Sequence, residues 1–488
     1  MSHTAVTSSA TSKTRTQRLA YQISDFLMSN LAMAIYNIVR YYLLQDLITQ
    51  QGFKSLCAFL SDNMVILGQV CFPVAMMGIY WLSGYYNNVY RKSLLQEATT
   101  TFASTFVCMI MVYFVALIND TVIDHFLNYE ILLALWVILL ACVYPLRLII
   151  TMHEKRLIAQ SQIEFPALII GCDSKAQKFA TELGNLKDKL GYSVTGFVNI
   201  NNDNNAPTQI GGLPVHNFNE IETVCKQRGI TDLIVVPQGK DMDNILHTLN
   251  RLFPFNLPVK LLSDEKTDLF LSRGRLDTVY GTPLIDISSS NITECETNLK
   301  RTSDILFSII ALIVLLPFLA IIAAIIKIGS KGPVIFKQQR IGLHGKPFTI
   351  YKFRTMVVDA EADGQPKLTS LDDNRITCIG RILRKYRIDE LPQFWNVLRG
   401  DMALVGPRPE RQYFIDRIVK RAPQYTLLQQ VRPGLTSFGM VKYGYASSIE
   451  SMVERMRYDL IYIENISFAT DLKIMIYTIW TVVTGKGL

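Results

Sequence analysis

Five long apolar segments constrain the fold of this 488-residue chain more than any other feature of its sequence. Four of them, at about 22–45, 63–84, 99–119 and 129–151, approach the roughly 20 residues that a helix needs to cross a bilayer. The chain is 49% hydrophobic and only 18% charged, a combination that is rare in soluble proteins. We therefore expect a four-helix transmembrane domain over residues 21–155. A soluble bundle of buried helices is the alternative, but such helices would show polar faces.

Basic residues indicate how this domain is oriented. They lie before the first segment (Lys13, Arg15, Arg18), between the second and third (Arg91, Lys92) and at or after the end of the fourth (Arg147, Lys155, Arg156). The link before the fourth segment is acidic, with Asp120, Asp124 and Glu130, and Lys54 in the first link is a mild exception. The positive-inside rule then places both ends of the domain in the cytoplasm. Residues 1–20 are rich in Ser and Thr, and we expect a disordered cytoplasmic tail there.

The pattern changes between residues 160 and 270, where short apolar runs such as FPALIIG and DLIVVP alternate with helical stretches. This alternation predicts a Rossmann-like α/β domain with a parallel sheet. Its first turn, GCDSKA at 171–176, keeps only the first glycine of the GxGxxG pattern that lets a backbone approach a pyrophosphate. We therefore favour a regulatory or oligomer-forming domain over a dinucleotide site. Residues 271–299 are expected to be a polar linker.

The fifth apolar segment, Ile305 to Ile328, is interrupted by Pro317. Basic residues flank it on both sides, so charge asymmetry does not orient it. A proline removes one helical hydrogen bond and bends the axis. We therefore expect a re-entrant membrane helix over 304–329, which enters and leaves the bilayer on the same face, within a C-terminal domain over 300–488.

An acid pair lies in the stretch DELPQFWNVLRGDMALVGPRP at 389–409. Asp389 and Glu390 precede Pro392, and Leu391, Phe394, Trp395 and Leu398 follow at helical spacing, which predicts a short helix with one apolar face that stops at Gly400. A helix N-terminus favours ionised carboxylates. Asp389 is thus a candidate nucleophile and Glu390 a candidate metal ligand, although such a pair also serves as an ordinary helix cap.

Cations surround this pair in the sequence. Lys352 and Arg354 share one face of the predicted strand TIYKFRTM, Arg384 lies just before the pair, and stiff proline turns carry Arg408 and Arg432. These five side chains predict a phosphate-binding surface, with a solvated strand and carbonyl-capping turns as the alternatives. We also expect the nearby cations to lower the pKa of Asp389. Asp359 could assist a metal.

The stretch 389–409, together with YKFRTM and RPG on either side, resembles the signature of the bacterial sugar transferases, which are polyprenyl-phosphate hexose-1-phosphate transferases or monotopic phosphoglycosyl transferases. The resemblance covers about the last two fifths of the chain, and the N-terminal half is similar to that of the large family members. It implies that Asp389 is the nucleophile, that Glu390 holds Mg²⁺, that Arg384, Arg408 and Arg432 bind phosphate, and that Asp459 is a supporting acid. The family usually has Ser before the kink proline, where this chain has Leu316, and LTSFGMVKYG from Leu435 also departs from its pattern.

The resemblance further implies a reaction. A hexose-1-phosphate passes from a UDP-hexose, glucose or galactose by preference, to undecaprenyl phosphate, which releases UMP and initiates a surface polysaccharide. The enzyme would be a multi-pass protein of the bacterial cytoplasmic (inner) membrane, in contact with membrane lipid and with its catalytic domain on the cytoplasmic face. A homodimer is compatible with the extra domains, and no basic aromatic block suggests nucleic acid. A non-catalytic scaffold and a glycosyltransferase that releases UDP are the alternatives.

Overall fold

The computed structural model describes the chain except for residues 1–2, 51, 88–89, 91, 119–124, 187–190, 201–206, 238–241, 253–254, 256, 263–274, 277–283, 288–291, 330–331, 358–372, 445, 447 and 485–488. Arg91, Asp120 and Asp124, which were used to orient the membrane domain, lie outside the described residues. The N-terminal unit, the α/β domain and the C-terminal domain are each described separately below.

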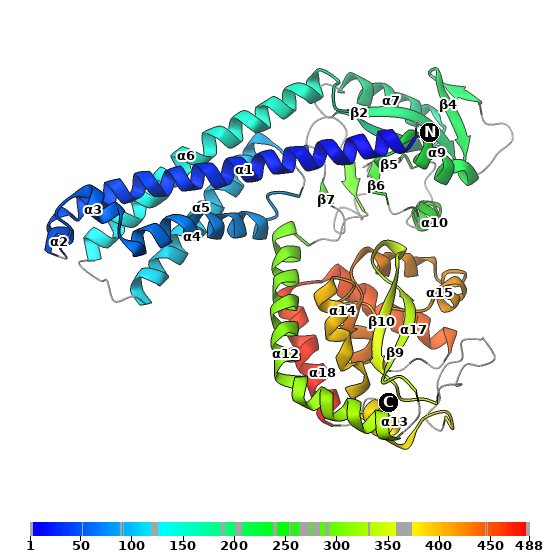
Figure 1. Ribbon diagram of the computed structural model, residues 1–488. Helices are drawn as coiled ribbons and strands as arrows, with labels where there is room; N and C mark the ends of the chain where they lie inside the picture. Colours follow the sequence, from blue (N-terminus) through cyan, green and yellow to red (C-terminus); the bar gives the residue numbers. More distant parts are fainter. Residues whose placement is uncertain are drawn as a thin grey trace. The chain divides into compact units, whose positions relative to one another are not determined.

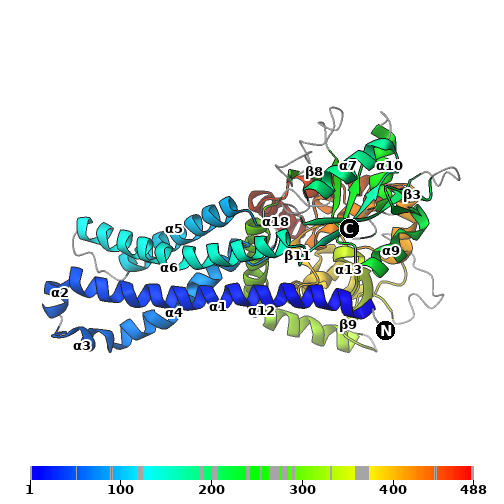
Figure 2. The same ribbon diagram turned by 90° about the horizontal axis from the view of Figure 1, so that it is seen from above.

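The N-terminal unit is helical. Its long helices are α1 (His3–Leu43), α4 (Asn63–Leu82), α5 (Leu94–Ile118) and α6 (His125–Ala159), and two short helices, α2 (Gln45–Gln50) and α3 (Leu56–Leu60), join α1 to α4. Figures 1 and 2 show the four long helices running side by side. Helix α1 begins at His3, so the expectation of a disordered tail over residues 1–20 is wrong. The helix continues without a break from that segment into the bundle.

By length and composition, four helices among the described residues could cross a membrane: Asn63–Leu82, Leu94–Phe114, Tyr129–Ala159 and Glu294–Gly329. Three of them match predicted spans. The first predicted span, 22–45, lies largely in α1, which is not among the four because polar side chains interrupt its apolar run. Several of these side chains, including Asp25, Ser29 and Asn37, are buried in the unit.

The buried polar groups of α1 meet a buried arginine. Asp25 Oδ1 and Oδ2 each accept a hydrogen bond of 2.7 Å from the Arg147 guanidinium on α6. That guanidinium lies between the rings of Tyr80 and Tyr85, at 3.8 and 3.7 Å from their centroids. Arg147 is one of the basic residues from which the positive-inside rule predicts the cytoplasmic side, but its side chain is fully buried. It therefore joins the first and last helices of the unit.

The α/β domain contains a mixed eight-stranded sheet in the order β3-β4-β2-β1-β5-β6-β8-β7. The strands are β1 (Phe165–Ile170), β2 (Tyr192–Asn199), β3 (Gln209–Ile210), β4 (Leu213–Asn217), β5 (Asp232–Val235), β6 (Val259–Leu262), β7 (Arg275–Leu276) and β8 (Leu284–Asp286). Strands β1, β5 and β6 pair in parallel, as do β2 and β4, whereas β3, β7 and β8 pair antiparallel. The predicted linker 271–299 is thus partly wrong, because it supplies β7 and β8 and the start of α12.

Helices α7 (Ser174–Asn185), α9 (Ile221–Arg228) and α10 (Met242–Leu252) accompany this sheet. Asp173 Oδ1 accepts a hydrogen bond of 2.9 Å from the backbone N–H of Ala176 at the start of α7. A carboxylate of the chain therefore already occupies part of the helix N-terminus that a pyrophosphate uses in dinucleotide-binding domains.

The C-terminal domain starts with α12 (Glu294–Gly329) and the antiparallel hairpin β9 (Ile335–Ile341) and β10 (Pro347–Phe353). Then follow α13 (Cys378–Lys385), the 3₁₀ turn η4 (Ile388–Gln393), α14 (Phe394–Arg399), β11 (Ala403–Val405), α15 (Gln412–Val419), the 3₁₀ segment η5 (Pro423–Gln430), β12 (Gly434–Thr436), α16 (Phe438–Lys442), α17 (Ile449–Glu464) and α18 (Phe468–Val483). Its apolar core is built mainly by residues from α14 to α18, including Val397, Met402, Ile418, Met456 and Ile474.

Helix α12 bends partway along its length (Figure 1). Pro317 lies inside it and accounts for the bend, because the ring removes a backbone donor and clashes with the preceding turn. Asp304 and Ser308 are buried before the proline, and Ile322 and Ile326 are buried after it. Between these contacts the helix exposes large apolar side chains such as Ile313, Val314 and Leu316.

Candidate active site

The acid pair lies on η4, one turn before α14, rather than on a regular α-helix. Arg387, immediately before η4, has a left-handed backbone with φ of 52°, which turns the chain sharply out of α13. Gly400 ends α14 in the left-handed conformation, as predicted. Asp389 and Glu390 are only 8% and 5% exposed. Both carboxylates are therefore held inside the domain, where they need charged or hydrogen-bonding partners.

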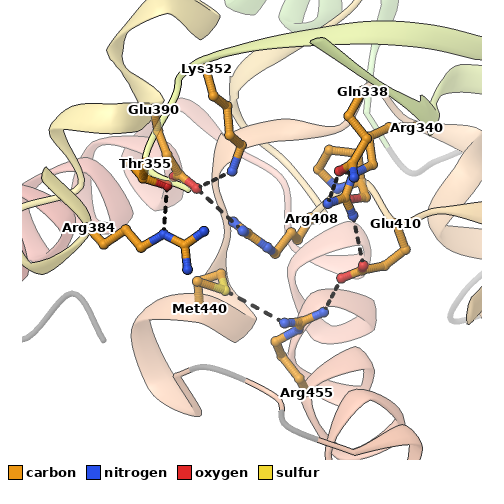
Figure 3. A network of polar contacts seen from close by, with 11 residues as sticks. Gln338, Arg340, Lys352, Thr355, Arg384, Glu390, Arg408, Glu410, Met440 and Arg455 are labelled. Atoms are coloured by element: carbon orange, nitrogen blue, oxygen red, sulfur yellow. Dashed lines mark hydrogen bonds and ion pairs between the residues drawn. The ribbon is translucent and has the colours of Figure 1, made fainter. Parts of the chain in front are cut away.

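Glu390 has two cationic partners from distant parts of the domain, shown in Figure 3. Its Oε1 lies 2.8 Å from Lys352 Nζ on β10 and 3.3 Å from Arg408 Nη2 on the turn after β11. Burial acts to raise the pKa of Glu390, but Lys352 and Arg408 outweigh it and hold that pKa well below its usual range. Glu390 is therefore ionised at neutral pH.

Asp389 behaves differently from its neighbour. Burial, together with the negative charge of Glu390, raises the pKa of Asp389 to about 6, although Lys352, Arg384 and Arg408 act in the opposite direction. Nearby cations do act to lower the pKa of Asp389, as expected, but desolvation exceeds their effect and the net shift of the pKa is upward. Asp389 is still mostly ionised above pH 7, and a buried carboxylate with a raised pKa is a more basic and more reactive nucleophile.

Of the two further predicted phosphate ligands on this side of the sequence, Arg384 lies at the acid pair. Arg384 Nε on α13 donates a hydrogen bond of 2.8 Å to Thr355 Oγ1, and Arg384 is among the cations that act on Asp389. Arg354 follows β10 and is 7% exposed. The structure therefore brings Lys352, Arg384 and Arg408 around the acid pair.

Arg432 has a different partner. Its Nε donates a hydrogen bond of 3.2 Å to the carbonyl of Gly400, at the end of α14. Arg301 of α12 joins it there and donates to the carbonyls of Val397 and Leu398, at 2.7 and 3.1 Å. Two guanidiniums thus cap the carbonyl end of α14. In the described part of the chain, Arg432 makes no ion pair with Asp389 or Glu390.

The two remaining supporting acids are placed differently. Asp459 on α17 is 2% exposed and accepts a hydrogen bond of 2.8 Å from Gly439 N. Burial raises the pKa of Asp459 to about 6, and backbone hydrogen bonds from Gly439 and Arg408 act to lower it. Asp459 therefore fastens the turn that carries Arg408. Asp359 lies outside the described residues.

The turns that carry Arg408 and Arg432 depend on two glycines. Parallel pairing of β11 with β12 brings Gly406 and Gly434 together. A Cβ added at Gly406 would lie 2.4 Å from the carbonyl oxygen of Arg432, and one at Gly434 would lie 2.1 Å from Gly406 N. Any side chain at either position would push the two strands apart, so the close backbone approach explains both glycines.

The buried face of the acid-pair segment is not the apolar stripe seen in the sequence. Trp395 is 54% exposed, whereas Gln393 and Asn396 are buried. Asn396 bridges to β10, accepting from Tyr351 N at 3.1 Å and donating to the carbonyl of Thr349 at 2.7 Å. This amide therefore sets the distance between the strand of Lys352 and the turn of Glu390.

Sequence reasoning missed three residues at this site: Asn396, Glu410 and Arg455. Glu410 directly follows the Gly-Pro-Arg-Pro turn, and Arg455 falls on the buried stripe of α17 with Met452, Met456 and Asp459. A charged residue at helical spacing with buried apolar ones predicts a buried ion pair, and that signal was available.

The donor atoms at the acid pair suit Mg²⁺. Among the described residues, no group of three or more His, Cys, Asp or Glu side chains could hold a metal ion. Mg²⁺ usually binds to one or two carboxylates, with phosphate oxygens and waters completing its shell. Asp389 and Glu390 supply such hard oxygens, so the pair fits a magnesium ion that arrives with a diphosphate, and Glu390 is the residue that would hold it.

Comparison with known proteins finds relatives of the C-terminal part of the chain. Residues 295–485 match the family model described as bacterial sugar transferase. UDP-N-acetylgalactosamine-undecaprenyl-phosphate N-acetylgalactosaminephosphotransferase of Aeromonas hydrophila is 42% identical over 189 residues, which cover 39% of this chain and 44% of that protein. UDP-glucose:undecaprenyl-phosphate glucose-1-phosphate transferase of Klebsiella pneumoniae is 32% identical over 293 residues, which cover 60% of this chain and 62% of that protein.

A protein of the same name from Caulobacter vibrioides is 42% identical over 189 residues, which cover 38% of this chain and 70% of that protein. Against the relatives from Aeromonas and Klebsiella, the chain spans only 44% and 62% of their length.

Proposed function

The chain belongs to the bacterial sugar transferase family, and on that basis we propose that it transfers a sugar 1-phosphate from a UDP-sugar to undecaprenyl phosphate. The products are undecaprenyl-diphosphate-sugar and UMP, and the reaction starts a surface polysaccharide. Relatives named for glucose and for N-acetylgalactosamine transfer both match, so a hexose or an N-acetylhexosamine is the proposed sugar.

The observation that carries the proposal is the buried acid pair with two unlike carboxylates. Glu390 is ionised and paired with Lys352 and Arg408. Asp389 beside it has a raised pKa and no ion pair among the described residues. Two adjacent groups whose environments push their pKa values apart are suited to two different roles. We assign attack to Asp389 and charge organisation to Glu390.

In the first step, a carboxylate oxygen of Asp389 attacks the β-phosphorus of the UDP-sugar. The bond from that phosphorus to the bridging oxygen breaks, UMP leaves with the bond electrons, and the sugar phosphate stays on Asp389 as an acyl phosphate. In the second step, a phosphate oxygen of undecaprenyl phosphate attacks the same phosphorus, and the bond to Asp389 breaks. The carboxylate is regenerated, so the overall reaction is balanced.

The cations of the site stabilise the charge that these steps move. Lys352, Arg384 and Arg408 surround the acid pair and would hold the oxygens of the diphosphate and of the transferred phosphoryl group. Bound Mg²⁺ would add positive charge at the diphosphate and favour departure of UMP. Arg408 is the only one of the three on a proline-stiffened turn, which keeps its direction defined.

The packing of α12 supports a re-entrant membrane helix. Ser308 before Pro317 and Ile322 after it are both buried within the C-terminal domain. The 14 residues from one to the other rise by roughly 21 Å at most, whereas a bilayer core is about 30 Å thick. A helical segment this short cannot cross the bilayer core while both of its ends pack on the same domain. We propose that it dips into the cytoplasmic leaflet of the inner membrane, which keeps the acid pair beside cytoplasmic UDP-sugars.

Measurement of UMP release tests the proposal. Membranes containing the protein, supplied with UDP-glucose or UDP-N-acetylgalactosamine, undecaprenyl phosphate and Mg²⁺, should release UMP, and Asp389→Asn should abolish that release. The matched control is Asp416→Asn, the same change at an exposed acid of α15. Release of UDP would instead identify a glycosyltransferase, and no release with any UDP-sugar would favour a scaffold. Full activity of Asp389→Asn would exclude Asp389 as the nucleophile.

A further inference from the structure

A second buried carboxylate lies next to the site and has no part in the steps above. Glu410 is 5% exposed and lies between two guanidiniums (Figure 3). Its Oε1 is 2.5 Å from Arg455 Nη2 on α17, and its Oε2 is 3.2 Å from Arg340 Nη1 on β9. Removing one partner of such a buried pair leaves an uncompensated charge, so the three residues act as a unit.

Strand β9, which carries Arg340, also holds the backbone of the turn that carries Arg408. Arg340 Nη1 donates to the carbonyl of Pro409 at 3.2 Å, and the N–H of Ile341 donates to the carbonyl of Glu410 at 3.0 Å. On the other side, Gly434 N donates to the carbonyl of Pro407 at 2.9 Å. The turn is thus fastened on both sides of Arg408.

The hairpin β9–β10 connects this network to the acid pair. Its strand β10 supplies Lys352 to Glu390, and its strand β9 supplies Arg340 to Glu410. Antiparallel pairing, with Arg340 opposite Phe348 and Lys352 opposite Phe336, keeps the two cations at a set distance. The hairpin therefore couples the position of the turn to the position of the acid pair.

Arg455 extends the network to the segment that follows β12. Its Nη1 lies 3.7 Å from Met440 Sδ, and a Cβ added at Gly439 would lie 2.7 Å from Arg455 Cγ. Burial acts to raise the pKa of Glu410, but Arg455 and Arg340 hold that pKa below its ordinary value. Glu410 thus favours its ionised form and joins β9 to α17.

We propose that Glu410, paired with Arg340 and Arg455, is a positioning residue that directs the Arg408 guanidinium toward the diphosphate of the donor. The inference rests on the proposed function for the identity of the donor. It follows from the chain of contacts: Glu410 is two residues from Arg408, a proline separates them, and Arg408 reaches Glu390 at 3.3 Å. A stiff connection of this length transmits a shift of Glu410 directly to the guanidinium.

A double-mutant cycle between Glu410 and Arg408 tests the proposal, with the dissociation constant of UDP for the detergent-solubilised full chain as the readout. UDP carries both phosphates, so its binding is measured whether or not transfer occurs. We expect Arg408→Ala to weaken UDP binding by about tenfold to a hundredfold, because it removes a charge-assisted contact. Glu410→Gln should weaken it by about tenfold. The double variant should bind no more weakly than Arg408→Ala, because Glu410 acts only through that side chain.

The proposal is overturned if the loss of UDP affinity in the double variant equals the product of the losses in the two single variants. That result would mean that Glu410 supports binding independently of Arg408, as a merely structural residue would. Glu454→Gln, at an exposed acid next to Arg455, is the matched control and should bind UDP like the wild type. If Glu410→Gln does not fold, Arg340→Lys replaces it in the cycle, because lysine keeps the charge but its single nitrogen replaces the three guanidinium nitrogens that contact Gln338, Pro409 and Glu410.

The outcomes also separate this inference from the proposed function. A wild-type protein that binds UDP and gives an additive cycle contradicts the positioning role alone. A wild-type protein that binds UDP with a non-additive cycle, but releases no UMP from UDP-sugars, contradicts the transfer reaction and leaves the positioning role supported. Failure of the wild type to bind UDP would overturn both.

Discussion

Replacing either of the two adjacent carboxylates by its amide should change the stability of the fold, and in opposite directions. Asp389→Asn should raise the stability, and Glu390→Gln should lower it. The pKa of Asp389 rises from its ordinary value of 3.8 to about 6, mainly through burial. The folded state therefore favours the protonated form. The stability that this preference contributes is fully present below pH 3.8 and is lost as the pH rises through 6. At about 1.4 kcal/mol per pH unit, the ionised carboxylate costs about 3 kcal/mol at pH 8.

Asp389→Asn removes this cost because the amide is neutral at every pH. We expect the variant to be inactive but more stable than the wild type, by about 3 kcal/mol at pH 8 and by about half of that at pH 5. For a domain of this size, the gain at pH 8 corresponds to a rise in Tm of roughly 5–10 °C.

Glu390→Gln should do the reverse. The pKa of Glu390 is lowered, despite burial, by Lys352 and Arg408. The amide would leave those two cations without their shared counter-charge, which costs about 3–5 kcal/mol for a buried pair. The variant should therefore unfold at a lower temperature than the wild type at pH 8.

Thermal unfolding in detergent at pH 5 and pH 8, followed by tryptophan fluorescence, compares the two variants with the wild type. Asp416→Asn is the control for the loss of a surface charge and should leave Tm unchanged at both pH values. A lower Tm for Asp389→Asn at pH 8 would refute the reasoning. So would a gain in Tm that is the same at pH 5 as at pH 8, since the cost would then not arise from ionisation.

Three further predictions follow from single contacts. Because attack requires ionised Asp389, kcat/KM for UMP release should be flat above pH 7 and fall about tenfold per pH unit below pH 6; a flat profile down to pH 5 would contradict this. Arg147→Met removes one partner of the buried pair with Asp25 and should cost about 3–5 kcal/mol, seen as a lower yield of protease-resistant protein in membranes; an unchanged yield would show that the pair does not hold α1. Arg432→Ala should lower Tm, because it uncaps Gly400, while reducing UDP affinity less than Arg408→Ala does; an equal loss of affinity would return Arg432 to the phosphate-binding set.

Local patterns in the sequence were sufficient for much of this description. Apolar runs of bilayer length predicted three of the helices that could cross a membrane, and the proline in the fifth run predicted the bend of α12. The alternation of apolar runs with helical stretches predicted the α/β domain. These patterns are informative because helix and strand periods are properties of neighbouring residues.

Other properties were not accessible from local patterns. The buried face of the acid-pair segment carries Gln393 and Asn396 rather than the apolar stripe. Asn396 can be buried because β10 supplies hydrogen-bond partners for its side-chain amide. Helix α1 continues to His3 through a Ser- and Thr-rich segment that composition alone predicts to be disordered.

The sequence by itself determined which residues carry charge and which proline turns are stiff, and so it made Asp389, Glu390 and the arginine turns the candidate site residues. Only the tertiary structure decided which of these charged groups are buried and which of them pair with one another. Burial in the folded domain raises the pKa of Asp389. Lys352 and Arg408 form ion pairs with Glu390. Arg455 pairs with Glu410, 45 residues away in the sequence. Desolvation and the distance between charges set these outcomes, and both arise only when distant segments pack together.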